Sequence, residues 1–395
     1  MSNNVNKKIL NVPHLRFNEE IWQVKTLGEI CSKFDYGLGA EAIEYDGVNK
    51  YIRITDIDDE TSCFNCAKMV SPSYLDDQCI VQKNDILFAR TGASTGKTYI
   101  YNEKDGKLYF AGFLIRVNVN NDYDPYFIFQ QTKTQKYKNW VKITSARSGQ
   151  PGINAQEYKN YKIFYPSLLL QNKISKFLNL LDIRIQTQNK IIRKYESLIQ
   201  GIIDNIFSDN GLYSIGDEYK LEDILIPCAK NPVNTSDYKK ITIKLHYGGI
   251  EFSENSRVMA DTRPFYLRHT NEIIIGKQNY FNGSIAIISP EFNNTICSNA
   301  IMSFSVKNNY DLTFIYYCIS NKTFLSRRAF FADGTGQKEL SEKEFLDFKI
   351  RAPIYDKQKE IGLLLKKINQ MKELELSYLN QLHRQKHFFL CNMFI

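Results

Sequence analysis

The sequence predicts an α+β protein in which two similar β-rich α/β domains are separated by two long helices forming an antiparallel coiled coil. Three observations predict it. The second half of the chain repeats the first, each copy carries β-branched and aromatic runs around glycine turns, and each copy closes with an apolar stripe at heptad spacing. The chain has 395 residues, enough for two or three domains, and its 43% hydrophobic and 24% charged residues are ordinary for a globular protein.

The repeat has an offset of 187 residues and needs no gap between about residues 84 and 181. The matched pairs are Tyr123-Asp124 with Tyr310-Asp311, Gly149-Gln150 with Gly336-Gln337, Glu157 with Glu344, Lys162-Ile163 with Lys349-Ile350, Pro166 with Pro353, and Gln171 with Gln358. A period this long indicates a duplicated domain, because solenoid repeats run ~20 to 50 residues. Residues 31 to 83 and 228 to 270 hardly align, so we expect one scaffold with two different surfaces and approximate two-fold symmetry.

The stretch ILFARTGASTGKTYIY, residues 86 to 101, resembles a phosphate-binding loop but departs from it. Such a loop needs four residues between its first glycine and its Gly-Lys-Thr, followed by a helix that holds the phosphates. Here three residues separate Gly92 from Gly96, and an aromatic, β-branched run follows. The other copy has IIIGKQNYFNGSIAII at residues 273 to 288, without Gly-Lys-Thr. The stretch is therefore predicted to be a strand, a turn and a strand.

Each copy closes with a predicted long helix. Apolar residues of the first helix follow at alternating steps of four and three from Ile174, with Gln188 as one polar member, as in a coiled-coil seam. The predicted seam residues are Ile174, Leu178, Leu181, Ile185, Ile192, Tyr195, Ile199, Ile202, Ile361, Leu365, Ile368 and Leu382, with Met371, Leu374 and Tyr378 also at seam steps. The alternative is that each helix lies on its own domain. The expected boundaries are 1–165 and 209–353 for the domains and 166–208 and 354–395 for the helices.

The chain carries 51 Lys and Arg against 43 Asp and Glu, a formal charge of +8, which favours a polyanionic partner. Residues 125 to 156 contain no acidic residue, and neither do residues 312 to 332. Cations can neutralise phosphates while a Gly-Gln loop reaches base edges. The candidate DNA-binding residues are Arg90, Lys97, Lys133, Lys136, Lys138, Lys142, Arg147, Gln150, Lys277, Lys322, Arg327, Arg328, Gln337 and Lys338. For any single lysine the alternative is a solvated helix face, with Tyr137 and Trp140 packed inward.

Other chemistry is weakly supported. Eight scattered cysteines without a signal peptide are expected to be reduced thiols, and Cys63-x-x-Cys66 lacks the second ligand pair of a zinc site. His383 and His387 lack the glutamate of a metalloprotease helix. Two Glu-x-Lys triplets, at Glu157 and Glu218, have no partner aspartate for a metal, and no methyltransferase or dinucleotide motif occurs. We expect no catalytic residue, no bound metal or cofactor, and a cytoplasmic protein without membrane segments.

Several segments together resemble the specificity (S) subunit of type I restriction-modification systems. They are the opening Trp22-Gln-Val-Lys-Thr-Leu27-Gly28-Glu29-Ile30, the strand-turn element LFARTGASTGKTYIY, and a frame used twice. That frame stands as SGQPGINAQEYKNYKIFYPSLLLQNKI and as TGQKELSEKEFLDFKIRAPIYDKQKEI. The resemblance covers nearly the whole chain. The second copy departs from the pattern at its start, which has Tyr219-Lys-Leu221-Glu-Asp-Ile224.

The resemblance implies two target-recognition domains, each contacting one half of a bipartite double-stranded DNA site. The helices would set the spacer and dock two methyltransferase subunits, which bring S-adenosylmethionine and methylate adenine. Separate restriction subunits would bring ATP- and Mg-dependent translocation and cleavage. Two alternatives remain at this point: a coiled-coil adaptor that binds only proteins, and a stand-alone nucleotide hydrolase or nuclease.

Overall fold

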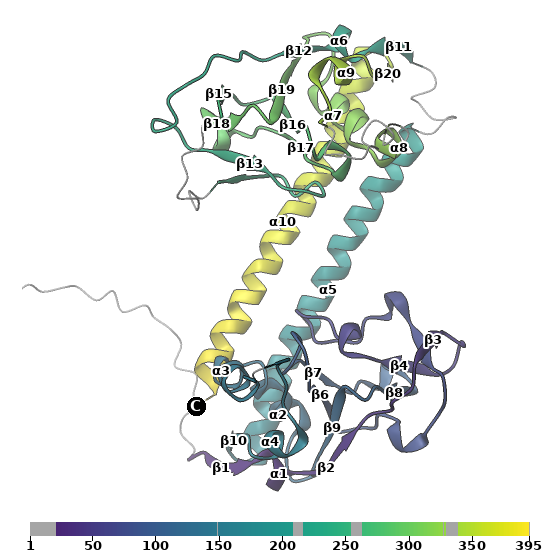
Figure 1. Cartoon of the computed structure of the whole chain (residues 1–395), viewed down its shortest axis with the longest axis vertical. Coiled ribbons are helices and arrows are strands. Elements are labelled where there is room, and N and C mark those ends of the chain that lie inside the picture. The colour runs from purple at the N-terminus through teal and green to yellow at the C-terminus, as the bar shows by residue number, and fades with distance from the viewer. Residues whose placement is uncertain are drawn as a thin grey trace, which may run out of the picture. The chain divides into compact units, whose positions relative to one another are not determined.

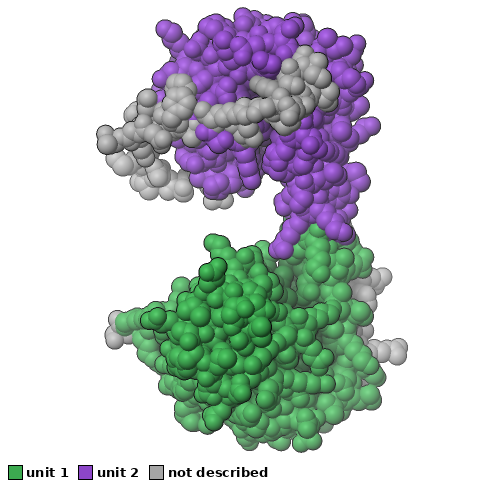
Figure 2. Space-filling model, turned by 90° about the vertical axis from the view of Figure 1, so that its right-hand side faces the viewer, with its two compact units in different colours: residues 1–190, 377–395 green, residues 191–376 purple. Residues whose placement is uncertain are grey.

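The computed structural model describes residues 21–147, 149–207, 216–253, 263–326, 328 and 339–394. Contacts divide the chain into two compact units. Unit 1 comprises residues 1–190 and 377–395, and unit 2 comprises residues 191–376 (Figure 2). Each unit therefore combines one globular head with a stretch of both long helices. Candidate residues Arg327, Gln337 and Lys338 lie outside the described residues.

The first head is built on a four-stranded sheet in the order β2-β9-β6-β7 (Figure 1). Three two-stranded pairs accompany it: β1 with β10, β3 with β5, and β4 with β8, the last pair parallel. The elements are β1 (Gln23–Thr26), α1 (Leu27–Ile30), β2 (Cys31–Tyr36), β3 (Ala42–Glu44), β4 (Lys50–Ile52), β5 (Val70–Pro72), β6 (Asp85–Ala89), β7 (Thr98–Ile100), β8 (Leu108–Phe110), β9 (Leu114–Val119), α2 (Pro125–Gln131), α3 (Gln135–Thr144), α4 (Ala155–Lys159) and β10 (Lys162–Tyr165).

The second head has the same central sheet, in the order β12-β19-β16-β17. Its other pairs are β11 with β20, β13 with β14, and β15 with β18. The elements are β11 (Asp217–Lys220), α6 (Leu221–Ile224), β12 (Leu225–Pro227), β13 (Ile241–Ile243), β14 (Ile250–Phe252), β15 (Phe265–Arg268), β16 (Ile273–Gly276), β17 (Ile285–Ile287), β18 (Thr295–Ser298), β19 (Ile301–Val306), α7 (Leu312–Ser320), α8 (Lys322–Ser326), α9 (Glu342–Leu346) and β20 (Lys349–Ala352). The predicted duplication is thus present strand by strand in the central sheets.

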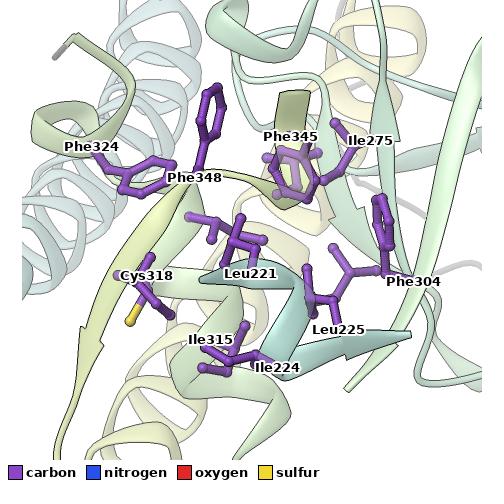
Figure 3. Packing of buried hydrophobic residues seen from close by; sticks show 14 of the residues in the cluster. Leu221, Ile224, Leu225, Ile275, Phe304, Ile315, Cys318, Phe324, Phe345 and Phe348 are labelled. Carbon is purple, nitrogen blue, oxygen red and sulfur yellow. The ribbon is translucent and has the colours of Figure 1, made fainter. Parts of the chain in front are cut away.

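The cores of the heads are formed by the same apolar runs from which the strands are predicted. All residues of β6 are buried, because Ile86 and Phe88 pack into one hydrophobic cluster while Leu87 and Ala89 pack into another. In the second head, aromatic side chains of α9 and β19 meet leucines and isoleucines from α6 and α7 (Figure 3). Phe345 is fully buried at this point, with its ring 5.2 Å from that of Phe304. Each head therefore has a hydrophobic core of its own.

A buried glutamine fastens each long helix to its head. The side-chain amide of Gln171 donates to the carbonyl of Pro166 (2.9 Å), and its oxygen accepts from the N–H of Asp124 (3.1 Å). Gln358 makes the same two bonds to Pro353 (2.8 Å) and Asp311 (3.1 Å). The two aspartates in turn cap α2 and α7. The repeated Pro-x4-Gln pattern is therefore a structural joint that satisfies otherwise buried polar groups.

The long helices are α5 (Leu168–Phe207) and α10 (Tyr355–Met393). They run antiparallel within unit 1, where Phe177 meets Phe389 at 4.7 Å between rings and Arg184 lies 5.3 Å from the ring centre of Tyr378. Moving forward along α5 thus means moving back along α10. Their far ends also enter the cores, since Leu390 and Met393 pack in the first head, and Ile203 and Ile206 in the second. The predicted fold class is confirmed.

The packed face of α5 follows the predicted heptads. Ile174, Leu178, Ile185 and Ile192 are buried, and Leu181, Tyr195, Ile199 and Ile202 are half-buried, while Gln188 is a buried polar member. On α10 the residues Ile361, Leu365, Ile368 and Leu382 are buried as expected.

Between those positions α10 departs from the prediction. Met371 and Leu374, expected at the seam, are 50% and 71% exposed, whereas Leu379 is buried. Continuing the heptad from Ile368 reaches Lys372 and Glu375, neither of which is fully exposed. The apolar pattern misled the prediction because polar residues occupy seam positions here. None of the helices in the described part of the chain is long and apolar enough to cross a membrane.

Candidate nucleic-acid interface

The predicted strand-turn-strand of the first head is the hairpin of β6 and β7, and its turn packs against α3. Gly92 and Gly96 both have positive φ, 76° and 88°. A Cβ on Gly96 would lie only 2.6 Å from Cγ1 of Val141, so a side chain there would collide with α3. Lys97 pairs with Asp59 at 2.5 Å, and strand β7 follows directly. These glycines therefore serve the turn and its packing, as the strand-turn-strand prediction requires.

Backbone hydrogen bonds, together called the clasp, join the end of this hairpin to the segment before β9 and to the Gly-Gln loop. The N–H of Arg90 donates to the carbonyl of Phe113 (3.0 Å), and the carbonyl of Arg90 accepts from Ile153 (2.8 Å). Gly92 donates to the carbonyl of Pro151 (2.9 Å) in the same loop. The segments after β6, before β9 and before α4 thus meet at one edge of the first head.

The second head repeats the clasp at the positions 187 residues later. Lys277 donates to the carbonyl of Ala300 (3.0 Å) and accepts from Leu340 (3.1 Å). Since Lys277 aligns with Arg90, each head fixes one cationic residue at the same place in its fold. This matched pair is what the sequence comparison predicted for the strand ends.

Arg90 is presented on an aromatic side chain. Its guanidinium carbon lies 4.6 Å from the ring centre of Tyr36, at the end of β2. The Tyr36 hydroxyl accepts from the N–H of Ala155 (3.3 Å), at the start of α4. Phe113 is 63% exposed, and the exposed side chain of Gln150 lies beside Gly92. Arginine, glutamine and aromatic groups therefore gather at this edge.

Helix α3 has a buried aromatic face and an exposed basic face. Tyr137 is buried and donates to the carbonyl of Gly96 (3.0 Å), and Trp140 packs on the rings of Tyr158 and Tyr161. Lys138 and Lys142, four residues apart, are exposed on the other face. The interleaved aromatic residues are thus part of the core, and the two lysines are available to an anion.

Three other candidates of the first head are bound into the structure. The ammonium of Lys133 is enclosed and donates to the side chains of Ser62 (2.7 Å) and Thr98 (2.6 Å), and burial lowers its pKa well below the usual range. The ammonium of Lys136 lies 3.4 Å from the ring centre of Phe164, and desolvation lowers the pKa of this ammonium. Arg147 pairs with Glu157 and donates to the carbonyl of Thr144 (3.0 Å).

In the second head Arg328 is likewise structural. It stacks on the ring of Phe324 at 3.7 Å and donates to the carbonyl of Lys349 (2.8 Å). Lys322, at the start of α8, is exposed. The described candidates whose charges or amides are not engaged by these contacts are Arg90, Lys138, Lys142, Gln150, Lys277 and Lys322, of which Arg90 and Lys277 are half-buried and the others exposed.

Sequence reasoning missed Tyr36 and Phe113. Tyr36 lies in the region that does not align between the copies, and Phe113 matches Ala300, so neither belongs to the repeated pattern. The only available signal was the Asp35-Tyr36-Gly37 stretch near a strand end, and that is too common to stand out. Pairing of β2 with β9, which joins Tyr36 to Ile115, is what brings both aromatics beside Arg90.

Within the described ranges, no group of three or more His, Cys, Asp or Glu residues lies close enough together to hold a metal ion. All eight cysteines are free, and Cys63 accepts a hydrogen bond from Gln186 at 3.2 Å. The structure thus offers a basic and aromatic surface suited to binding.

Comparison with known proteins identifies the relatives of the chain. Residues 19–196 and 215–384 match the model of the type I restriction modification DNA specificity domain. The type I restriction enzyme MjaVIII specificity subunit of Methanocaldococcus jannaschii is 23% identical over 337 residues, covering 78% of each chain. The putative MjaX specificity subunit of that organism is 24% identical, covering 93% of this chain and 91% of the relative.

A solved structure has the same fold. The crystal structure of a type I restriction-modification S subunit from M. genitalium superposes with a TM-score of 0.66 at 17% identity, covering 96% of this chain and 97% of that one. The two family matches span most of the chain and coincide with its two heads and adjoining helices. The chain therefore belongs to the type I restriction modification DNA specificity family and carries the family's domain twice.

Proposed function

We propose that this chain recognises a bipartite DNA site, with each head contacting one half. Family membership makes it a specificity subunit, a component that directs the reaction and does not catalyse it. The observation that carries the proposal is the clasp repeated in both heads. It fixes a cation between the segment before β9 or β19 and the segment before α4 or α9, as Arg90 (bonded to Phe113 and Ile153) in one head and as Lys277 (bonded to Ala300 and Leu340) in the other.

Two kinds of contact follow from the accessible side chains. Lysines 138, 142 and 322 are compact charges suited to phosphates, which give affinity and depend on salt. Arg90 and Gln150 carry planar groups that can form paired hydrogen bonds to base edges in the major groove. Because the heads share a frame but differ in surface, they suit two different half-sites.

The chemistry belongs to the expected partners. Two methyltransferase subunits would bind S-adenosylmethionine and methylate adenine after it has been flipped from the duplex. Restriction subunits, where present, would use ATP and Mg²⁺ for translocation and cleavage. The role of this chain is to hold the partners on one sequence, in the cytoplasm where the cell's DNA lies.

The long helices are the proposed docking surface for the methyltransferase subunits. In unit 2, α10 leaves Leu363, Leu364, Met371 and Leu374 between 48% and 71% exposed. These apolar residues recur at helical spacing outside the packed face of α10 and are suited to apolar helices of a partner. Substitution of Leu374 by Glu is expected to weaken assembly with the methyltransferase, measured by co-purification.

The test is a genome-wide map of N6-methyladenine in the host, with and without this chain. The proposal expects one bipartite motif with a constant spacer to lose methylation when the chain is deleted. Exchange of residues 217–353 for another second head should then alter one half of the motif and leave the other. An unchanged methylation map in cells that express the chain and its methyltransferase would refute the proposal.

A further inference from the structure

The cations at the two matched clasps differ in how they are presented. Arg90 lies on the ring of Tyr36, whereas Lys277 has no aromatic ring within cation–π distance among the described residues. Phe113 flanks Arg90, while Ala300 takes its place beside Lys277. The same point of the frame therefore carries a planar, stacked donor in one head and a point charge in the other.

The position of Arg90 is held from both sides. Its backbone N–H and carbonyl are both used by the clasp, at 3.0 and 2.8 Å. Tyr36 is held by strand pairing with Ile115 and by the hydrogen bond from Ala155 to its hydroxyl. Stacking on a fixed ring restricts the guanidinium, so less conformational entropy is lost when it binds.

The donors of Arg90 are nevertheless uncommitted. Within the described part of the chain its guanidinium makes no hydrogen bond or ion pair, in contrast to Arg147 and Arg328. A guanidinium is planar, so its N–H groups form a rigid fork that can donate two parallel hydrogen bonds. That fork matches the O6 and N7 acceptors of guanine in the major groove, the commonest specific arginine contact to DNA.

The neighbours of Arg90 favour a base over a phosphate. Phe113 and Tyr36 are 63% and 44% exposed, and apolar surface is suited to base edges and thymine methyl groups. The amide of Gln150 lies in the adjoining loop and offers a second paired contact. A phosphate contact would need only charge, which the exposed Lys138 and Lys142 already supply on α3, the helix that packs against the hairpin turn.

We propose that Arg90, stacked on Tyr36, is a specificity-determining residue that reads a guanine in the half-site of the first head. Lys277 makes a phosphate contact at the matched place in the second head. This inference rests on the proposed function and adds the chemical identity of one base. It requires that one half of the methylation motif contain a G·C pair.

The experiment uses the complete complex of this chain with its methyltransferase subunits. Duplexes carrying each of the four base pairs at each half-site position are methylated in competition, and the products are sequenced. Arg90→Lys keeps the charge but removes the fork. It should reduce selectivity for guanine at one position of one half-site by roughly 5- to 150-fold, the range for a paired contact. Tyr36→Leu should reduce selectivity at the same position by less.

Matched variants separate this effect from misfolding and from simple charge loss. Lys277→Ala should slow methylation of all sequences alike, without changing the preferred base. Lys104→Ala, an exposed lysine beyond the opposite end of β7, serves as the neutral control. Thermal melting and co-purification with the methyltransferase confirm that each variant folds and assembles.

Either of two outcomes would overturn the inference. One is a first half-site that contains only A·T pairs. The other is an Arg90→Lys complex that retains the wild-type base preference at every position. In both cases the bipartite motif still depends on the chain, so the proposed function would stand while the role of Arg90 falls. Loss of the motif's dependence on the chain would instead reject both.

Discussion

The two heads have one frame and different outer parts. The central sheets match strand for strand, and Gln171 and Gln358 make the same pair of hydrogen bonds. Outside the frame, β8 has a full parallel partner in β4 and a single antiparallel bridge from Ile80. Its match β18 has a full antiparallel partner in β15 and a single parallel bridge from Lys240. The frame thus positions the proposed recognition surface and fastens the long helix, while the outer strands are free to diverge.

The cores of the two frames should be equally important to stability. Phe345 of the second head matches Tyr158 of the first, and both are fully buried. Substitution of either by alanine leaves a large cavity and should cost about 3–5 kcal/mol in the free energy of unfolding. Hydrogen exchange measured separately in each head would test this. A loss confined to one substitution would break the equivalence of the frames.

The first head has a polar contact to the helices that has no counterpart among the described residues of the second. Asp182 of α5 accepts from Lys386 of α10 (2.5 Å), from Gln130 (2.9 Å) and from the hydroxyl of Tyr126. The residue 187 positions later is Asn369. Asp182→Ala should cost about 1–3 kcal/mol, because it leaves buried donors without an acceptor.

Asn369→Ala is the matched control and should change stability by less than about 0.5 kcal/mol. Chemical denaturation of both variants would measure the difference. Equal effects would mean that the contact at Asp182 does not distinguish the heads.

A rise of stability with pH that comes from a buried lysine should be confined to the first head. Burial lowers the pKa of Lys133, so in the folded protein this group loses its proton at a lower pH than in the unfolded chain. The unfolded chain then binds more protons between the two pKa values, and stability rises with pH until the unfolded pKa of ~10.4 is passed. Lys133→Met should remove this rise.

The free energy of unfolding is measured for the wild type and for Lys133→Met at pH 7 and at pH 9.5. The difference between the two proteins is then compared between the two pH values. Taking the difference cancels the opposite contribution of buried tyrosines and thiols, whose raised pKa values make stability fall with pH. A difference that stays constant with pH would contradict the assignment. Ser320 holds the matched place in the second head and offers no such group.

The smallest effect concerns affinity without sequence preference. Lys142→Ala should weaken binding of the assembled complex to all DNA sequences alike and reduce the salt slope by about one. Fluorescence binding titrations at several salt concentrations would measure it. A change in base preference would instead place Lys142 among the base-contacting residues.

The features that could be predicted from the sequence are those with a local signal in the chain. Glycines in the turn, β-branched runs beside it and the heptads of the first helix are local signals, and the duplication doubled each of them. The second helix was harder because Lys372 and Glu375 occupy seam positions, where an apolar pattern looks for leucine. The buried Lys133 was mistaken for a surface cation for a similar reason: its three oxygen acceptors come from residues far away in the chain.

By itself, the sequence determined the duplicated frame, the order of head and helix, and the basic character of the matched segments. These properties depend on periodicity and composition, which are written along the chain. Tertiary structure decided which cations remain accessible, that Arg90 rests on Tyr36, and that Tyr137 and Trp140 belong to the core. Such outcomes depend on contacts between residues that are distant in the sequence. Tyr36 and Arg90, for example, come together because β9 pairs with both β2 and β6.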